Sequence, residues 1–328
     1  STGGAANGNG SDYIYIAIRR PMKTPESGTE VFALQNPGYP LGSNGLAYTS
    51  GFPVDWALSK EVSATDDWIA MSRLQGAGKR LRTNTSAAES GGVSSGTFDH
   101  MTGWYKTTSA NMSWMFKRAP GFMDVVAYTG SGSNTTQAHN LGVAPEFMIV
   151  KNRDIADEWA VYHKDIDVDS DSAPETDRIY MTTQAAGDNV STWYDTAPTA
   201  ATFGIGTHHD VNASSEKYIA YLFATVAGVS KVGGYTGTAA SLDLDMGFAA
   251  GARFFLVRRW DATAQWYIFD TARGIIAGND PYLRMNSSGA QVTSTDYVDP
   301  LASGLTLTAA GSTTINISGG KYIFLAIA

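Results

Sequence analysis

The residues with the most direct chemical potential are four aspartates in one short segment, Asp165, Asp167, Asp169 and Asp171. Carboxylate oxygens at this alternate spacing are ligands that Ca²⁺ prefers in proteins. The segment is not an EF-hand loop, because its sixth position lacks glycine and Thr176 stands where the twelfth-position glutamate belongs. Two interpretations stay open, a structural Ca²⁺ site and a solvated acidic loop.

A second group with metal-ligating side chains is His208-His209-Asp210, accompanied by His163 and His139 in the same part of the chain. Imidazole nitrogens suit transition metals. Adjacent residues of a strand point to opposite faces, however, so one metal ion would not bind both neighbouring histidines. We therefore expect a role in a loop or an interface for this group.

Glycoside hydrolysis is the enzymatic alternative, and it needs two carboxylates roughly 5–10 Å apart in a cleft. Acidic residues do recur beside three tryptophans, but aspartate and glutamate before a strand are ordinary turn residues. The chain also lacks the nucleophile motif of serine hydrolases. We expect no catalytic residues. The acidic candidates weighed are Asp66, Asp67, Asp157, Glu158 and Asp261.

Aromatic residues could supply a carbohydrate-binding surface, because the chain has 16 tyrosines and 8 tryptophans. Most of them lie in strand-like apolar runs, where core packing is the expected role. Trp104-Tyr105 and Trp193-Tyr194 lie instead in loop-like contexts. We predict that Trp104, Tyr105, Trp193 and Tyr194 are exposed and form the binding surface.

The elements that would position these residues are organised around a hairpin pattern that occurs three times. In each copy a basic residue precedes a tryptophan by eight positions, and an apolar run lies on either side. The pairs are Lys60 and Trp68, Lys151 and Trp159, and Arg258 and Trp266. Residues present in every copy are expected to serve the fold, so we predict that Trp68, Trp159 and Trp266 anchor the core of each repeat. Function should then lie where the copies differ.

Further landmarks recur in the same order, including a closing apolar strand such as Tyr322–Ala328. They divide the chain into repeats at 22–119, 120–226 and 227–328. Residues 1–21 form a polar N-terminal arm and a strand, which we interpret as the end of a preceding repeat in a longer array. Completion of another unit by this strand is the alternative.

The predicted fold class is all-β, with three tandem β-sandwich (or flattened barrel) repeats of about 100 residues each. Short apolar runs alternate with clusters of glycine, serine, threonine, asparagine and aspartate, which is typical of strands and turns. No segment holds a convincing helical period.

Composition excludes several functions. The 328 residues include no cysteine, which rules out disulfides and thiolate chemistry, and the net charge is -8. An acidic chain without a basic run is poorly suited to nucleic acid or an anionic membrane. No apolar run approaches the length of a membrane span.

One family resemblance is carried by Tyr128-Thr-Gly-Ser-Gly, by His139-Asn-Leu-Gly-Val-Ala-Pro-Glu-Phe-Met-Ile-Val-Lys151, and by the pairs Glu158-Trp and Tyr162-His163. This string resembles repeat domains in structural proteins of tailed bacteriophages, notably tail-fibre or other appendage proteins of marine phages. The resemblance is strongest in the middle repeat and weakest in the first.

The resemblance implies a non-enzymatic virion protein, made in the host cytoplasm and assembled into the extracellular particle. It implies other virion proteins as partners, a homo-oligomer such as a trimer, and host-surface glycan or receptor binding through loops. It implies no catalytic residues. We expect no cofactor, apart from the structural Ca²⁺ that is one of the two interpretations of the aspartate segment. The alternatives are a capsid-surface decoration protein or head fibre and, from another class, a glycan depolymerase of the tailspike kind.

Overall fold

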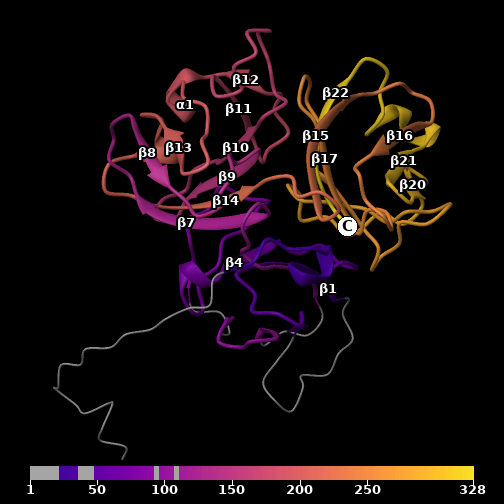
Figure 1. The fold of residues 1–328 in the computed structure, drawn as a ribbon, viewed down its shortest axis with the longest axis horizontal. Coiled ribbons are helices and arrows are strands. Elements are labelled where there is room, and N and C mark those ends of the chain that lie inside the picture. Colours follow the sequence, from indigo (N-terminus) through magenta and orange to yellow (C-terminus); the bar gives the residue numbers. More distant parts are fainter. Residues whose placement is uncertain (1–21, 36–47, 92–95, 107–110) are drawn as a thin grey trace, which may run out of the picture.

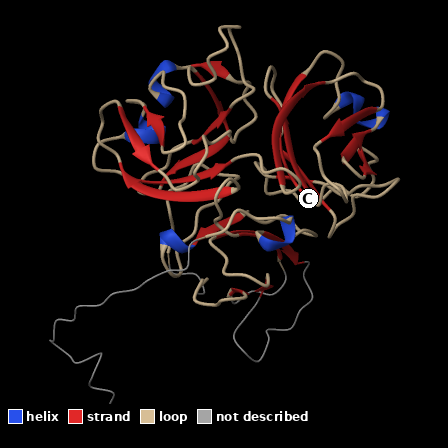
Figure 2. Ribbon diagram, viewed as in Figure 1, coloured by secondary structure: helices blue, strands red, loops and turns tan. Residues whose placement is uncertain are grey.

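The computed structural model describes residues 22–35, 48–91, 96–106 and 111–328. The predicted arm and strand within 1–21 lie outside these described residues. Strands make up most of the described regular structure, and the helices are single short turns (Figure 2). The predicted all-β class is confirmed, with several separate antiparallel sheets and no closed barrel among the described strands.

The described sheets fall into three groups that are consecutive in the chain, called here the first, second and third units (22–119, 120–226 and 227–328). In the first unit a four-stranded sheet of order β1-β6-β3-β4 faces the pair β2-β5. Its elements are η1 (Gly28–Glu30), β1 (Phe32–Gln35), β2 (Tyr48–Thr49), β3 (Trp56–Lys60), β4 (Ile69–Ser72), η2 (Arg73–Gln75), β5 (Gly103–Trp104) and β6 (Met112–Phe116).

The second unit has a six-stranded sheet of order β12-β11-β10-β9-β14-β7 and the pair β13-β8. Its elements are β7 (Met123–Thr129), β8 (Thr135–Ala138), β9 (Phe147–Asn152), β10 (Trp159–His163), β11 (Asp177–Tyr180), β12 (Gly187–Asp188), α1 (Val190–Trp193), β13 (Thr202–Ile205), α2 (His209–Asn212) and β14 (Lys217–Phe223).

The third unit has a five-stranded sheet of order β15-β22-β17-β18-β19 and a three-stranded sheet of order β16-β21-β20. Its elements are β15 (Ser230–Thr236), β16 (Leu242–Asp245), β17 (Phe254–Arg259), β18 (Tyr267–Asp270), β19 (Leu283–Arg284), β20 (Val298–Leu301), β21 (Gly304–Leu307), η3 (Ala309–Thr313) and β22 (Lys321–Ile327).

The repeated sequence pattern forms the same three strands in every unit. The predicted hairpins are β3–β4, β9–β10 and β17–β18, and each first strand also pairs with the closing strand β6, β14 or β22. The predicted hairpin is therefore confirmed in all three copies.

The first strand of each hairpin begins with an apolar run, and residues on both of its faces are buried. In β17, Phe255 and Val257 face the core of the third unit, whereas Phe254 and Leu256 belong to a larger cluster shared by all three units. The strands of the first and second units divide their side chains between local and shared clusters in the same way. The centre of the molecule is thus a common core made by three sheets.

The three units close into a ring around this shared core, as Figure 1 shows. The segment after each hairpin, called here the crossing loop (81–90, 179–186 and 283–291), binds the hairpin of the next unit. The first crossing loop binds the second unit, the second binds the third, and the third returns to the first. The backbone bonds are Asp157 N to Ser86 O, Glu89 N to Arg153 O, Ala264 N to Thr183 O, Ala186 N to Trp260 O, Asp66 N to Ser288 O and Gln291 N to Val62 O.

The three recurring tryptophans pack and form hydrogen bonds at these junctions between units. Each is buried in the shared core, and each indole N–H donates to a backbone oxygen of a neighbouring unit's crossing loop. The bonds are Trp68 to Arg284 O (2.9 Å), Trp159 to Arg82 O (3.0 Å) and Trp266 to Tyr180 O (3.0 Å). The predicted anchoring role needs one correction, because the core they anchor lies between the units rather than inside each one.

The basic residue of each hairpin is also fully buried. Lys60 donates to the backbone oxygens of Asp66 and Ser288, and Arg258 donates to those of Tyr180, Thr182 and Gln184. Two of the three basic residues therefore reach across a junction. Burial lowers the pKa of Lys151 to about 8 and that of Arg258 to about 9.

Candidate functional site

One candidate for a binding site is a hollow in the second unit that is lined in part by residues of α1. Figure 1 places α1 at the outer edge of this unit. The hollow has a volume of about 550 Å³. Its side chains combine an aromatic ring with hydroxyl, amide and carboxyl groups. They belong to Asn134, Val190, Ser191, Tyr194, Asp195, Thr196 and Thr207. We call this site the Tyr194 hollow.

Tyr194 lies in a tight turn after α1, and the position of this turn is set by its own backbone conformation and by close contact with β13. Tyr194 and Asp195 both have left-handed backbones, with φ of 63° and 44°. For residues other than glycine this conformation costs about 1–2 kcal/mol each. Behind the turn stands Gly204, where a Cβ atom would lie 2.3 Å from the backbone oxygen of Trp193. The close approach fixes α1 against β13 and leaves Tyr194 39% exposed.

The neighbouring Trp193 faces the opposite way. It is 1% exposed, packs edge-on against Tyr162 at 5.9 Å, and donates its indole N–H to the Asp177 oxygen at 2.9 Å. The prediction that Trp193 is an exposed binding residue is wrong. A single helical turn places consecutive residues on different sides, so one of the pair is buried and Tyr194 is exposed.

The other predicted pair does not form a binding surface. Trp104 is fully buried, stacked between Tyr48 at 5.2 Å and Phe98 at 5.5 Å, and its indole donates to Ser113 Oγ. The predicted exposure of Trp104 is therefore wrong, because it fills the core between the two sheets of the first unit. Tyr105 is half-buried and its backbone pairs with Thr97.

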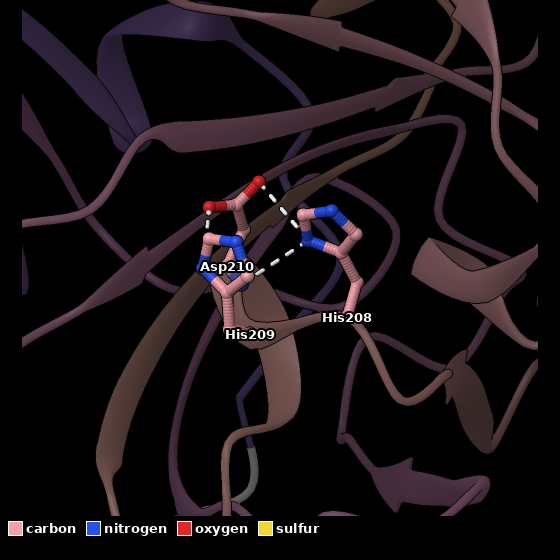
Figure 3. A group of neighbouring side chains, drawn as sticks. All are labelled: His208, His209 and Asp210. Atoms are coloured by element: carbon pink, nitrogen blue, oxygen red, sulfur yellow. Dashed lines mark hydrogen bonds and ion pairs between the residues drawn. The ribbon is translucent and has the colours of Figure 1, made fainter.

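His208, His209 and Asp210 form a compact cluster at the start of α2 (Figure 3). The two imidazole rings stack with centroids 4.5 Å apart, so the expectation that they point to opposite faces is wrong. That expectation assumed a strand, whereas the residues begin a helical turn. His208 Nδ1 lies 3.2 Å from Asp210 Oδ2, and its Nε2 lies 2.8 Å from the Arg178 guanidinium.

This cluster is suited to holding the fold rather than a metal ion. A metal bound to His208 and Asp210 would face the Arg178 cation, which lies 3.7 Å from the Asp210 carboxylate. Burial alone would raise the pKa of Asp210, but hydrogen bonds with His208, Asp157 and Tyr180 outweigh it and hold that pKa far below its usual range. The arrangement joins α2 to β11 and to the hairpin turn of the second unit.

The acidic residues weighed for glycoside hydrolysis are engaged as turn residues. Burial raises the pKa of Asp157, whose Oδ2 lies 2.8 Å from His209 Nδ1, and Asp210 Oδ1 lies 3.4 Å from the same nitrogen. One imidazole thus engages both carboxylates, whereas glycoside hydrolysis needs two carboxylates placed across a cleft. Asp67 pairs with Arg82, and Asp261 pairs with Arg259.

Two further hollows lie between units. One of about 310 Å³ lies beside Trp159 at the meeting point of the crossing loops, and Glu158 is the only carboxylate among its lining residues. Another of about 560 Å³ lies between the second and third units and contains Trp260. Lys321 covers the ring of Trp260 at 5.0 Å, so this aromatic face is not available for stacking.

The acidic segment after β10 was predicted to bring four aspartates together, and the structure brings three of them together. Asp167, Asp169 and Asp171 each offer a carboxylate oxygen, and these oxygens lie within 4.8 Å of one another. Asp165 is not part of this group, because it turns toward the third unit beside Gly234. Asp177 was missed from sequence, since it lies six residues beyond the aspartate run, at the start of β11.

Among the described residues, none of the helices combines the length and apolarity that crossing a membrane requires.

The fold and these sites define an all-β protein of three related units closed into a ring, with a polar hollow on one unit. Residues 107–328 match the family described as domain of unknown function DUF7483, and the chain belongs to this family. A search of curated proteins finds no match.

Proposed function

We propose that this chain is a non-enzymatic structural protein of a bacteriophage virion, in a tail fibre or another appendage, and that it binds surface glycan through the Tyr194 hollow. The observation that carries the binding part is the exposed Tyr194 ring in a hollow lined mostly by polar side chains. The virion part rests on the resemblance of the repeats to tailed-phage structural proteins.

The chemistry of the Tyr194 hollow suits a sugar. The apolar face of a pyranose ring packs on an aromatic side chain, while its hydroxyls exchange hydrogen bonds with short polar groups. Ser191, Asp195, Thr196 and Asn134 supply such groups around Tyr194. Most of the lining residues lie in 187–214, one of the segments where the three units differ, which is where a function not shared by the repeats is expected.

A single shallow site of this kind binds weakly, and identical sites on several chains would raise the overall affinity through effective concentration. This favours a homo-oligomer, such as a trimer, with other virion proteins as partners. The ring has a shared core and no cysteine, so packing and hydrogen bonds at the junctions keep the rim in place without disulfides. The alternative is a capsid decoration protein or head fibre, which would bind glycan through the same Tyr194 hollow. It differs from a tail appendage in the part of the particle to which the chain is attached.

The absence of catalysis in this proposal rests on the carboxylate geometry. Asp157 and Asp210 both contact His209 Nδ1, and Glu158 is the only carboxylate among the residues that line the central hollow. A glycan depolymerase would need a second carboxylate across the bound sugar.

The binding test uses affinity electrophoresis of the full chain through gels that contain bacterial surface polysaccharides. Wild type should be retarded by at least one polysaccharide, Tyr194→Ala should migrate freely, and Tyr194→Phe should keep most of the retardation. Ile276→Ala, which removes an apolar side chain 53% exposed on the third unit, is the matched control and should behave as wild type. Equal retardation of wild type and Tyr194→Ala would overturn the assignment of the site.

Two further measurements test the other parts of the proposal. Polysaccharide incubated with the protein should keep its chain length, and shortened chains would establish a depolymerase instead. Mass measurement in solution should give a multiple of the chain mass, and labelled antibodies should bind an appendage of particles that contain the chain. A monomer, or labelling over the shell, would contradict the fibre assignment.

A further inference from the structure

The acidic segment of the second unit gathers three carboxylates at one point. Oxygens of Asp167, Asp169 and Asp171 lie within 4.8 Å of one another. Two ligands on opposite sides of one Ca²⁺ ion are separated by up to about 5 Å, so all three oxygens could touch a single ion. Surface acidic clusters are common without any ion, however, so this spacing alone establishes nothing.

The second observation is Asp177, which lies against the same segment at the start of β11. It is 1% exposed, and its Oδ2 accepts a hydrogen bond from the Val168 amide at 2.9 Å, between two of the clustered aspartates. Its Oδ1 is buried and has no hydrogen-bond partner among the described residues. A buried carboxylate oxygen without a donor is costly, and such a group calls for an unseen partner.

The charges around Asp177 point the same way. Asp177 Oδ2 binds the amide of Val168, the residue between Asp167 and Asp169, so the Asp177 carboxylate lies beside the three clustered carboxylates. A positive charge placed among the four would satisfy the unpaired oxygen and relieve their mutual repulsion.

We infer that Asp167, Asp169, Asp171 and Asp177 form a Ca²⁺ site in the second unit. Four carboxylates supply hard oxygen ligands, and water completes the coordination of six to eight oxygens that Ca²⁺ takes. Two of the loop carboxylates also brace the loop through one oxygen each, since Asp167 Oδ1 accepts from Ser172 N and Asp171 Oδ1 accepts from Ala173 N. Asp165 is not a ligand.

The site is tied to the rim of the second unit through the backbone of Asp177. Its oxygen accepts the Trp193 indole N–H at 2.9 Å, and the preceding oxygen of Thr176 accepts from Asn189 N at 2.6 Å. Asp177 also pairs with Asp188 across β11 and β12. Binding of Ca²⁺ to this site would therefore stabilise the segment that leads into α1, whether or not the Tyr194 hollow binds sugar.

The experiment measures ion binding directly on the full chain after dialysis against a chelator. Titration calorimetry with Ca²⁺ should give one site, and Tb³⁺ should show emission sensitised by the nearby Trp193. Added Ca²⁺ should quench that emission, whereas Mg²⁺ at the same concentration should not. Absence of Ca²⁺ binding by wild type, or equal displacement by Mg²⁺, would overturn the inference.

Three variants separate ligation from general charge. Asp177→Asn keeps an oxygen that can accept from Val168 N, so the fold should persist while Ca²⁺ binding weakens by about tenfold or more, given the loss of one charged ligand. Asp169→Asn changes a side chain on the surface and should have the same effect. Asp165→Asn, the matched control in the same segment, should bind as wild type. If Asp165→Asn lowered the Ca²⁺ affinity as much as Asp177→Asn, the binding would be non-specific electrostatic attraction and the inference of a defined site would be overturned.

Discussion

The indole nitrogen of Trp159, in the second unit, lies 3.0 Å from the backbone oxygen of Arg82, in the first unit. The same nitrogen lies 3.2 Å from the oxygen of Thr85. The bond recurs at the two other junctions with matched residues, so the three repeats are related by approximate threefold symmetry. The repeated tryptophan is consequently a device that joins units.

The first prediction concerns the substitution Trp159→Phe. The phenyl ring keeps most of the buried apolar area but leaves the Arg82 oxygen without its donor, which should cost about 1–3 kcal/mol. Chemical denaturation followed by circular dichroism measures the change. Because the core is shared, all three units should still unfold in one transition. Separate transitions for the second unit and the rest would contradict the shared core.

Each hairpin has one buried basic residue, and replacing the one in the third unit, Arg258→Met, should lower the free energy of unfolding more than replacing either of the others. The change leaves the oxygens of Tyr180, Thr182 and Gln184 unpaired, while it also removes a buried charge, so the net loss should be about 2–4 kcal/mol. Thermal unfolding of the variant measures it. Arg259→Met, which removes a surface ion pair with Asp261, is the neighbouring control and should change stability little.

Acid sensitivity should depend in part on His163. Its Nδ1 accepts from Asp165 N, its Nε2 lies 3.3 Å from the Phe324 oxygen of the third unit, and burial lowers its pKa to about 3. Between about pH 6.5 and 3 the unfolded chain binds a proton that the folded chain does not, so the free energy of unfolding falls as pH drops through this window.

The measurement compares denaturation midpoints of wild type and His163→Gln at about pH 7 and about pH 4.5. The variant should lose less stability over this interval than wild type. His100→Gln, at a half-exposed position in the first unit, should lose as much as wild type. An identical loss in wild type and His163→Gln would show that this histidine does not contribute.

The rim of the second unit should be sensitive to Gly204→Ala. The added methyl would lie 2.3 Å from the Trp193 oxygen and 3.2 Å from the Thr196 oxygen, so the turn that carries Tyr194 must move. Limited proteolysis should then cleave between 188 and 200 faster than in wild type. Gly187→Ala, where no atom lies within 4 Å of the new methyl, provides the control and should be cleaved at the wild-type rate.

The hairpins and the all-β class were predictable because they depend on local patterns, apolar runs separated by turn residues. The ring was not, because its junctions are made largely by backbone groups. The amide of Asp157 binds the oxygen of Ser86, and any residue type could supply either atom. One available signal was the unbroken apolar character of strands such as Phe254–Val257, which indicates burial on both faces.

For the candidate site, the prediction of an exposed aromatic residue holds for Tyr194, whereas Trp193 and Trp104 are buried. Trp193 and Tyr194 are adjacent aromatic residues in the same sequence context. Which of them is exposed depends on the geometry of the helical turn, which the sequence does not reveal. Asp177 was missed for a related reason. Its proximity to Asp169 comes from the chain folding back at β11, which spacing along the sequence does not reveal.

The ring also imposes an order in time on the newly made chain. Trp68 donates to the oxygen of Arg284, 216 positions later, so the first unit cannot complete its junction until residue 284 has left the ribosome. Until then its apolar face stays unpaired and open to association with other chains. Contacts this distant in sequence also slow folding, because a long loop must close before they stabilise anything.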